Sequence, residues 1–379
     1  MLKVGITGQS GFIGTHLLNT LRLFPDKFRT IPFEEDFFMN EEKLNSFVNN
    51  CDVIVHLAAM NRHKDPNVIY ETNLDLVKRL IQTCTETDAA PHILFSSSIQ
   101  EERDNLYGKS KKDGRLLFEK WAMESNAKFT GLVIPNVFGP FGEPFYNSVV
   151  ATFCHQLNRN EEPKIEVDGE LKLIYVGELV SEIIEHIEAM QYEDKSKAIA
   201  DTVVLPHTSS ITVSGLLEKL TDYKNNYLGK GIIPDLGDPF NRNLFNTFLC
   251  YADLKSMFPF QLKQNTDNRG SFVEIIKSNN KGQFSFSTTK PGITRGNHFH
   301  KRKAERFAVI KGQARIEIRR VGTDKKECFQ LNEDNPSFVD MPIWYTHNIM
   351  NIGEEDLYTF FWTSEFFDPN DPDTFFEEV

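Results

Sequence analysis

The sequence has few of the features that suit an extracellular or membrane-spanning protein. Its five cysteines, at positions 51, 84, 154, 250 and 328, are odd in number and widely spread, and no CxxC pair occurs. This pattern predicts reduced thiols and excludes a disulfide framework. No stretch reaches the roughly 20 apolar residues of a membrane span, and the opening residues MLKVGITGQS hold no apolar signal core. We therefore expect a soluble cytoplasmic protein.

A positive net charge is also absent. The sequence has 42 Lys and Arg residues and 54 Asp and Glu residues, which gives a formal net charge of −12. This balance argues against a general binder of nucleic acid or of anionic membranes. A phosphate ligand would have to be held by local groups. The 379 residues, 40% of them hydrophobic and 25% charged, suit a globular protein of two or three domains.

The first part of the chain alternates short apolar runs with amphipathic stretches. The run DVIVHLAA at 52–59 is apolar throughout, which is typical of a buried parallel strand. Alternation of strands and helices predicts an α/β Rossmann-type, doubly wound parallel sheet over residues 1–245. We expect strands at 3–8, 28–33, 52–59, 92–98 and 129–139, and helices at 12–24, 41–50, 68–86 and 106–125.

From about residue 245 the pattern changes to short alternating or aromatic runs punctuated by Gly, Asn, Asp and Pro. This sequence pattern predicts an all-β sandwich or barrel over residues 255–379. The stretch IIPDLGDPFNRNLFNTF at 232–248 is expected to be the connection between the two parts.

Gly8, Gly11 and Gly14 form a GxxGxxG motif after a predicted strand and at the opening of a predicted helix. A tight turn, close approach to a pyrophosphate and close helix packing each favour glycine, and the helix N-terminus offers free N–H groups to phosphates. The motif predicts dinucleotide binding; a plain glycine-rich turn is the alternative. Acidic residues 34–36 are candidates for the ribose hydroxyl but equally suit a solvated charge run, so the choice between NADH and NADPH stays open.

Tyr107 and Lys111 are four residues apart and share a helix face. An ammonium group beside a phenol would lower the phenol's pKa, and such a tyrosine can exchange a proton with a carbonyl or alcohol. A serine hydroxyl from the preceding strand end, in LFSSS at 94–98, can hydrogen-bond the same oxygen. Together with the glycine motif, this predicts a hydride-transfer site.

His298 and His300 lie two residues apart, so on a strand they point to one face. Glu305 follows shortly after, and His347 arrives later in PIWYTHNIMN. Three imidazoles and a carboxylate converging inside a barrel predict a divalent metal site, suited to zinc but also to nickel, manganese or iron.

The motifs GQSGFIG, HLAA, YETNLD, FSSS, YGKSK and NVFGP stand in the order found in the extended short-chain dehydrogenase/reductases, and the first 240 residues resemble that family. The resemblance implies that Tyr107 is the catalytic acid/base, Lys111 its partner and ribose ligand, and Ser98 the carbonyl-binding residue. It implies cofactor contacts from two further groups of residues: Gly8, Ser10, Gly11, Phe12, Ile13 and Gly14, and then His56, Leu57, Ala58 and Asn73, together with Tyr107 and Lys111.

Two points of this resemblance need a structural test. Asn136 would touch a nucleotide-sugar substrate, or else cap a turn after a strand. Only eight residues separate Ser98 from Tyr107, where the family has a longer loop. Eight extended residues span about 25 Å, so the triad stays reachable, and we expect a more open sugar pocket on that side.

Residues 260–365 resemble the cupins, which are jelly-roll barrels. The first cupin motif matches from Gly292 to Gly312, and the second matches at Pro342, His347 and Asn351. Trp344 replaces a motif glycine, so we expect an altered turn there. The KRK run at 301–303 suits either a solvated face or a diphosphate, Arg295 and Lys303 are candidates for binding substrate, and Lys303 is also a candidate base.

The order of reductase and cupin resembles one family across essentially the whole chain, the bifunctional capsular-polysaccharide and O-antigen enzymes. That resemblance implies zinc-dependent C3 epimerisation of a UDP-2-acetamido-2,6-dideoxy-4-hexulose in the cupin, followed by NADPH-dependent reduction of the 4-keto group. The implied product is UDP-2-acetamido-2,6-dideoxy-L-talose, a precursor of UDP-N-acetyl-L-fucosamine, and the implied assembly is a homodimer. The alternative is a simple reductase whose cupin only binds metal for folding or dimerisation.

Overall fold

A computed structural model describes residues 1–190, 198–262, 264–267, 270–273, 275–278, 282–365 and 368–379. The chain forms two compact units that are not continuous in sequence. Unit 1 holds residues 1–138, 142–149 and 169–211, and unit 2 holds residues 139–141, 150–168 and 212–379.

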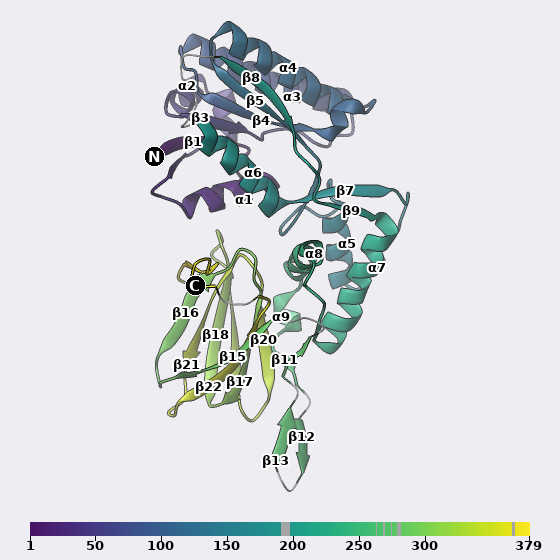
Figure 1. The fold of residues 1–379 in the computed structure, drawn as a ribbon, viewed down its shortest axis with the longest axis vertical. Helices are drawn as coiled ribbons and strands as arrows, with labels where there is room; N and C mark the ends of the chain where they lie inside the picture. The colour runs from purple at the N-terminus through teal and green to yellow at the C-terminus, as the bar shows by residue number, and fades with distance from the viewer. Residues whose placement is uncertain (191–197, 263, 268–269, 274, 279–281, 366–367) are drawn as a thin grey trace. The chain divides into compact units, whose positions relative to one another are not determined.

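Unit 1 is built on a parallel sheet of six strands in the order β2-β1-β3-β4-β5-β8 (Figure 1). The central strand β3 is buried along its whole length, because helices cover both faces of the sheet. The strands are β1 (Leu2–Thr7), β2 (Phe28–Ile31), β3 (Val53–His56), β4 (His92–Ser98), β5 (Lys128–Ile134) and β8 (Ile199–Val204).

The helices of unit 1 lie in two layers, α2, α3 and α4 on one face of the sheet and α1 and α6 on the other (Figure 1). They are α1 (Phe12–Arg22), α2 (Glu41–Asn49), α3 (Pro66–Glu86), α4 (Leu106–Glu124) and α6 (Val176–Ala189). A smaller sheet in the order β6-β7-β9 adds β6 (Asn136–Phe138), β7 (Glu170–Tyr175) and β9 (Ser209–Thr212). The predicted Rossmann-like parallel sheet is confirmed.

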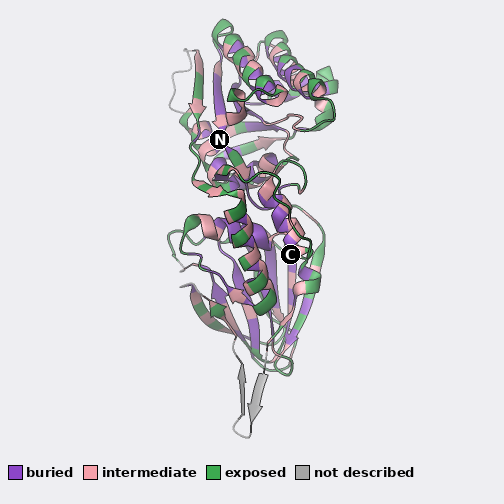
Figure 2. Cartoon of the chain, turned by 90° about the vertical axis from the view of Figure 1, so that its right-hand side faces the viewer, coloured by how far each residue is buried: buried purple, intermediate pink, exposed green. Residues whose placement is uncertain are grey.

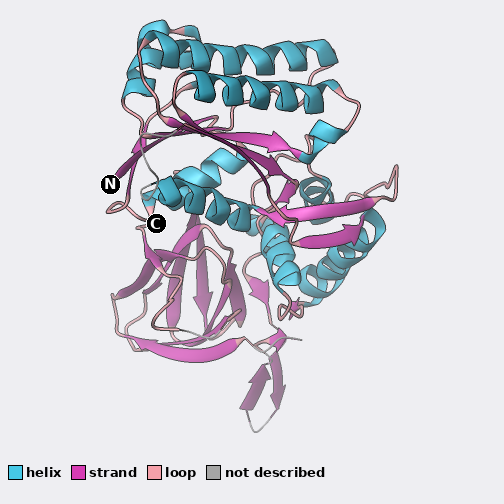
Figure 3. Cartoon of the chain, turned by 45° about the horizontal axis from the view of Figure 1, so that its top comes forward, coloured by secondary structure: helices cyan, strands magenta, loops and turns pink. Residues whose placement is uncertain are grey.

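Unit 2 contains two antiparallel sheets of five strands, ordered β11-β20-β17-β22-β15 and β19-β18-β21-β16-β23. Figure 3 shows them as a strand-rich region. The strands are β11 (Phe260–Gln261), β15 (Gln283–Thr289), β16 (Thr294–Phe299), β17 (Glu305–Lys311), β18 (Gln313–Arg320), β19 (Lys326–Asn332), β20 (Ser337–Met341), β21 (Tyr345–Asn351), β22 (Leu357–Thr363) and β23 (Phe375–Phe376). The all-β prediction is confirmed; barrel closure stays a prediction.

A hydrophobic core lies between these two sheets. Ala308 of β17 and Phe338 of β20 come from the first, and Ile316 of β18 and Ile349 of β21 come from the second. Alternating burial along the strands produces this core, with inward residues buried and outward ones exposed (Figure 2).

Helices from distant parts of the chain also belong to unit 2: α5 (Val149–Asn158), α7 (Val213–Asp222), a π-helical turn η4 (Tyr223–Leu228), α8 (Pro239–Leu249) and the short α9 (Leu254–Met257). The expected connection at 232–248 is therefore largely helical. Asp238 accepts a hydrogen bond from the Phe240 N–H, and Pro239 occupies the first helical position, so α8 has a regular start. β10 (Ile232–Ile233), β12 (Gln264–Asp267), β13 (Gly270–Val273) and β14 (Lys277–Ser278) complete the elements.

None of the helices in the described part of the chain combines the length and apolar character that crossing a bilayer requires.

Candidate reductase and metal sites

The glycine motif forms the turn between β1 and α1. Gly8 has φ +74°, and a Cβ on it would lie 2.9 Å from the Ala58 nitrogen. A Cβ on Gly14 would lie 2.2 Å from the Gly8 oxygen, so this glycine is required for the close packing of α1 on the turn. Both positions exclude larger residues for reasons of backbone packing alone.

The N-terminus of α1 is suited to an anion. Gly11 is its N-cap, no side chain caps it, and its first turn holds no acidic residue. Its first N–H groups therefore remain available to a phosphate. Ser10 is exposed beside this end, and Phe12 and Ile13 are half-buried in the first turn.

The HLAA segment ends β3 next to the glycine turn. The Leu57 N–H donates to the Thr7 carbonyl at 3.1 Å, and the Ala58 N–H lies 3.3 Å from the Thr7 hydroxyl. The side chain of His56 instead lies in the core, 1% exposed, with its Nδ1 2.8 Å from that hydroxyl. Burial lowers the pKa of His56 to about 3, so this ring is neutral and packs against Phe95. Its side chain is not placed to line a cofactor pocket.

Asn73 connects three elements. Its Nδ2 donates to the Met60 carbonyl at 3.1 Å and to the Ser110 hydroxyl at 3.0 Å, and its Oδ1 accepts from the Met60 N–H at 2.7 Å. The residue is 5% exposed. It thus holds the chain after β3 and fixes α4 one residue before Lys111.

Tyr107 and Lys111 lie together at the carboxyl end of β4, as their spacing predicts. The Lys111 ammonium is 3% exposed, donates to the Ser96 carbonyl at 2.9 Å, and lies 5.8 Å from the centre of the Tyr107 ring. Ser98, the last residue of β4, accepts the Gln100 N–H at 3.2 Å through its hydroxyl oxygen. The hydroxyl hydrogen therefore remains free to donate elsewhere.

The expected lowering of the Tyr107 pKa is wrong for this structure. Burial raises the pKa of Tyr107 to about 12, and Tyr146 nearby adds to the effect. Burial also lowers the pKa of Lys111 to about 8, partly opposed by Glu101. The ammonium reaches the Ser96 carbonyl and not the phenol, so desolvation outweighs the charge that the spacing suggested.

The short connection between Ser98 and Tyr107 is compact and not extended. It forms a 3₁₀ turn, η2 (Ile99–Glu102), and Asn105 then caps α4 by accepting the Gly108 N–H at 2.7 Å. A Cβ on Gly108 would lie 1.9 Å from the Gln100 oxygen. Helix α4 therefore packs directly against the turn, which brings Tyr107 close to the strand end despite the missing loop.

Two other candidates lie at the surface of unit 1. Asn136 is exposed and opens β6, where it pairs with Leu173 of β7, so it is a strand residue and not a turn cap. The acidic residues 34–36 are all exposed, and Asp36 pairs with Lys43 at 2.6 Å. They start beyond the end of β2, with two residues in between.

His298, His300, Glu305 and His347 converge in unit 2, with their ligand atoms all within 4.8 Å of one another. Glu305 Oε2 lies 3.1 Å from His300 Nε2 and 3.0 Å from His347 Nε2. Both rings direct Nδ1 to a backbone carbonyl, so in their neutral forms these three buried atoms are all acceptors and none has a hydrogen-bond donor. Leaving such atoms unsatisfied is costly, so the residues fit a bound cation that would satisfy all of them at once.

Two residues of this cluster are held in the protonation state that binds a cation, whereas Glu305 raises the pKa of His300 against the effect of its burial. Burial and the neighbouring His347 lower the pKa of His298 to about 4, so its ring is neutral. Burial would raise the pKa of Glu305, but the neighbouring His300 holds it well below the usual range. His347 donates its Nδ1 hydrogen to the Tyr345 carbonyl at 3.2 Å, which leaves Nε2 as the ligand atom.

Trp344, which stands where the second cupin motif has glycine, adopts the left-handed backbone conformation that favours glycine. Its φ is +60°, and its N–H donates to the His300 carbonyl at 2.8 Å. Its indole stacks on Phe299 with ring centres 5.4 Å apart. The turn accepts a side chain because this stacking offsets the left-handed backbone strain.

Arg295 and Lys303 are placed differently from each other. Arg295 is exposed and donates to the Thr288 carbonyl at 3.2 Å. Lys303 is 5% exposed, and its ammonium donates to the Pro372 carbonyl at 2.7 Å.

One neighbour of the metal cluster was not expected from the sequence: the Asp373 carbonyl accepts a hydrogen bond from His300 Nδ1 at 2.5 Å. The segment DPNDPDTFF at 368–376 gives no recognisable motif for this contact.

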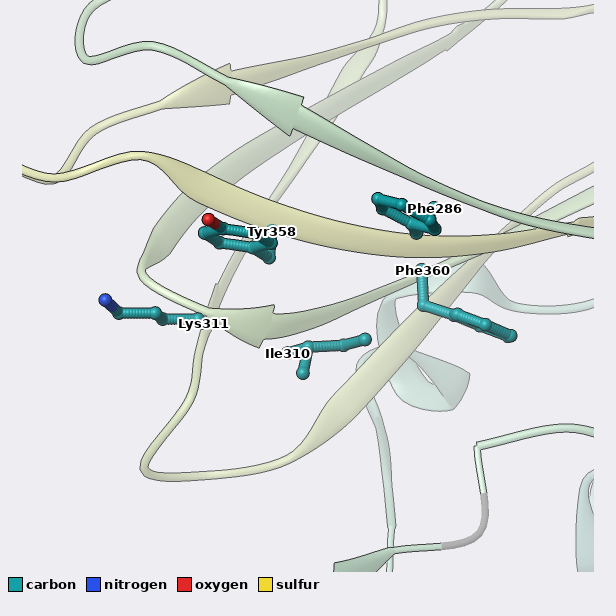
Figure 4. A pocket seen from close by; sticks show the side chains of 5 residues that line it. All are labelled: Phe286, Ile310, Lys311, Tyr358 and Phe360. Carbon is teal, nitrogen blue, oxygen red and sulfur yellow. The ribbon is translucent and has the colours of Figure 1, made fainter.

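A pocket of about 400 Å³ lies elsewhere in unit 2, on the outer side of the sheet formed by β15, β17 and β22 (Figure 4). It is lined by Phe286, Ile310, Lys311, Tyr358 and Phe360. None of these residues belongs to either candidate site.

The comparisons with known proteins cover the whole chain. Residues 4–199 match the NAD dependent epimerase/dehydratase family, and residues 265–375 match the polysaccharide biosynthesis C-terminal domain. A UDP-2-acetamido-2,6-beta-L-arabino-hexul-4-ose reductase from Pseudomonas aeruginosa is 32% identical over 375 residues, which cover 99% of this chain and 98% of that protein.

Two solved structures of the capsular polysaccharide assembling protein CapF are also similar and cover 100% of both chains. The structure from Staphylococcus aureus has 36% identity and a TM-score of 0.62. The structure with the inhibitor 3-isopropenyl-tropolone has 34% identity and a TM-score of 0.59.

Proposed function

Because the chain belongs to the NAD-dependent epimerase/dehydratase family of enzymes, we propose that it reduces the 4-keto group of a UDP-linked 2-acetamido-2,6-dideoxy-hexulose with NADPH. The product is UDP-2-acetamido-2,6-dideoxy-L-talose, a precursor of UDP-N-acetyl-L-fucosamine for capsule or O-antigen. The observation that carries this proposal is the buried Lys111 beside Tyr107 at the end of β4, in a chain that aligns along its full length with a keto-sugar reductase.

The residues of this site divide the reduction between them. A bound nicotinamide supplies the hydride that adds to carbon 4. Tyr107 donates its phenolic proton to the carbonyl oxygen, so that one hydride and one proton convert the ketone to the alcohol. The hydroxyl of Ser98 has a hydrogen free to donate to the same oxygen. The Lys111 ammonium, 5.8 Å from the centre of the Tyr107 ring, stabilises the negative charge of the phenolate as it forms.

We propose that unit 2 contains a zinc-dependent cupin that epimerises carbon 3 of the same substrate before reduction. The 4-keto group acidifies the neighbouring C–H, so removal and return of that proton inverts the centre. A divalent cation would supply positive charge against the enolate oxygen. His298, His300, Glu305 and His347 would hold the cation, as their unsatisfied buried atoms favour.

Support for a metal comes from the inhibitor found with the similar protein CapF. A tropolone carries adjacent carbonyl and hydroxyl oxygens, an arrangement that chelates divalent cations. The division into a reductase domain at 1–245 and a cupin barrel at 255–379, and assembly as a homodimer, belong to the same proposal.

Solvent deuterium tests the two activities separately. The keto-sugar is incubated in D₂O without nicotinamide cofactor, and deuterium at carbon 3 is followed by NMR. We expect uptake with the wild type, none with His300→Ala, and unchanged uptake with Tyr107→Phe. If carbon 3 takes up no deuterium while added NADPH still drives reduction, the cupin is a non-catalytic metal-binding module.

A further inference from the structure

The residues 371–378, called the strap below, lie along the metal cluster of unit 2. The strand β23 within the strap pairs antiparallel with the end of β16, so that Phe376 lies opposite His298 and Phe375 opposite Phe299. The Glu377 N–H donates to the Asn297 carbonyl at 2.9 Å and extends this pairing. The strap thus runs beside β16, which carries His298 and leads directly into His300.

Asp373 is the central residue of the strap. It is 3% exposed and has φ +44°, and its carbonyl accepts the Nδ1 hydrogen of His300 at 2.5 Å. Its carboxylate also accepts three backbone N–H groups that follow His300 directly, at 3.2 Å, 3.0 Å and 3.3 Å from Lys301, Arg302 and Lys303. One buried residue therefore fixes both the ring of His300 and the backbone that carries it.

The basic KRK run holds the strap from the other side. All three side chains reach toward it, so this run serves neither as a simple solvated face nor as a free diphosphate site. The Lys301 ammonium lies 5.3 Å from the ring centre of Phe375, Arg302 pairs with Asp371 at 2.8 Å, and the Lys303 ammonium donates to the Pro372 carbonyl at 2.7 Å.

An aromatic stack completes the attachment. Phe299, the last residue of β16, packs between Phe375 of the strap and Trp344 of the second motif, with ring centres 5.5 Å and 5.4 Å apart. The Thr346 hydroxyl donates to the Glu377 carbonyl next to His347. The strap is therefore in contact with the immediate surroundings of three of the four ligands.

We propose that the strap positions the metal site, with Asp373 as a positioning residue that holds His300 as the Nδ1–H tautomer and presents its Nε2 to the cation. This rests on the metal site proposed above. A carbonyl oxygen can only accept, so the hydrogen must be on Nδ1, and in the neutral ring that binds a cation the lone pair is then on Nε2. Such outer partners orient a ligand and typically contribute 10- to 100-fold to metal affinity.

The test measures zinc and cobalt affinity of the full chain by competition with a chromophoric chelator. We expect Asp373→Ala to weaken zinc binding by about 10- to 100-fold and to change the visible spectrum of bound Co²⁺, which reports the ligand geometry. Asp373→Asn keeps one acceptor oxygen and tolerates the left-handed backbone, so it should recover part of the loss. Deletion of 371–379 should lose binding altogether.

Asp356→Ala is the matched control, because it removes an exposed carboxylate of unit 2 in the loop between β21 and β22. It should bind zinc as the wild type does. The melting temperature of each metal-free variant shows whether it is folded. If a folded chain without residues 371–379 binds zinc with unchanged affinity and an unchanged Co²⁺ spectrum, the strap has no positioning role. Asp373→Ala keeps the backbone carbonyl that accepts from His300, so an unchanged Ala variant would refute the role of the carboxylate alone. If the wild type itself binds no stoichiometric zinc, the proposed metal site is refuted, and with it the proposed function of unit 2.

Discussion

Tyr107 is a phenol that burial keeps protonated. Its pKa is raised to about 12, while the lysine four residues later is held at about 8 by the same burial. A carbonyl reduction consumes the proton of the phenol, since this proton must move to the carbonyl oxygen as hydride arrives, and a nearby ammonium stabilises the phenolate that remains. Tyr107 and Lys111 are thus in the protonation states that donate a proton to a substrate and not in those that remove one.

Replacing Tyr107 by Phe removes this proton donor and little volume. We expect the rate of ketone reduction to fall by about 10²- to 10⁴-fold, the usual contribution of a positioned acid, while NADPH binding is retained. Stopped-flow measurement of NADPH oxidation checks the rate, and fluorescence titration checks binding. Retention of more than a tenth of the wild-type rate would show that another group donates the proton.

Lys111 makes the stability of the cofactor-free protein depend on pH. Its pKa is about 8 when folded and near 10.5 when unfolded, so between these values the unfolded chain binds more protons and stability rises with pH. The rise is at most about 3 kcal/mol. The rise in stability should be seen between pH 8 and 10. Above pH 10 the Tyr107 phenol loses its proton in the unfolded chain, which opposes the rise.

Urea denaturation at several pH values measures this rise. Lys111→Met should abolish it, whereas Lys112→Met, a change to the exposed neighbour in the same helix, should preserve it. An identical pH profile for Lys111→Met and the wild type would mean that the ammonium is not desolvated.

At the scale of elements, one buried ion pair joins two strands to a helical turn of unit 2. Arg306 of β17 is 1% exposed and donates to Asp340 of β20 at 2.7 Å and 2.9 Å, and to the Gly231 carbonyl at 3.1 Å. The Tyr227 hydroxyl of η4 donates to the same carboxylate. This network fixes η4 against the sheet through fully satisfied buried charges.

Arg306→Ala should destabilise unit 2 by about 3–5 kcal/mol, because it leaves the Asp340 carboxylate buried without a counter-charge. The double variant Arg306→Met, Asp340→Leu should recover most of that loss. Lys311→Ala, which removes an exposed pair on the same strand, should cost about 1 kcal/mol or less. Chemical denaturation measures all three. A double variant as unstable as the single one would contradict the role of the unpaired charge.

The sequence was sufficient for features that follow from local pattern. The period of apolar residues predicted the parallel sheet and the β-rich second part, and the spacing of His298 and His300 predicted a common face, because these depend on neighbours in the chain. Helix α8 was missed because its polar residues obscure the period. The partners of Lys111 and of the KRK run were also missed, since a hydrogen bond to the carbonyl of Pro372 depends on a tertiary contact that no local pattern records.

At the scale of the whole molecule, the metal proposal predicts two separable unfolding events. Dialysis against a strong chelator should lower the melting temperature of one calorimetric transition and leave the other, which NADPH raises, unchanged. A cation that binds only the folded state adds about 2.7 kcal/mol at a hundredfold excess over its dissociation constant. Added zinc should restore the first transition. A thermogram that is unchanged after a verified loss of zinc would count against a stabilising ion.

The path of the chain through its two units has a consequence for synthesis. Helix α5 belongs to unit 2, and the Asn158 side chain donates to the Phe248 carbonyl of α8 at 3.3 Å. At about 5–20 residues per second, a ribosome needs roughly 4–16 seconds to reach α8 after α5. Meanwhile the apolar face of α5, including Phe153 and Leu157, lacks the rest of unit 2, most of which follows residue 212. Nascent chains that stop before residue 239 should therefore recruit chaperones through this face.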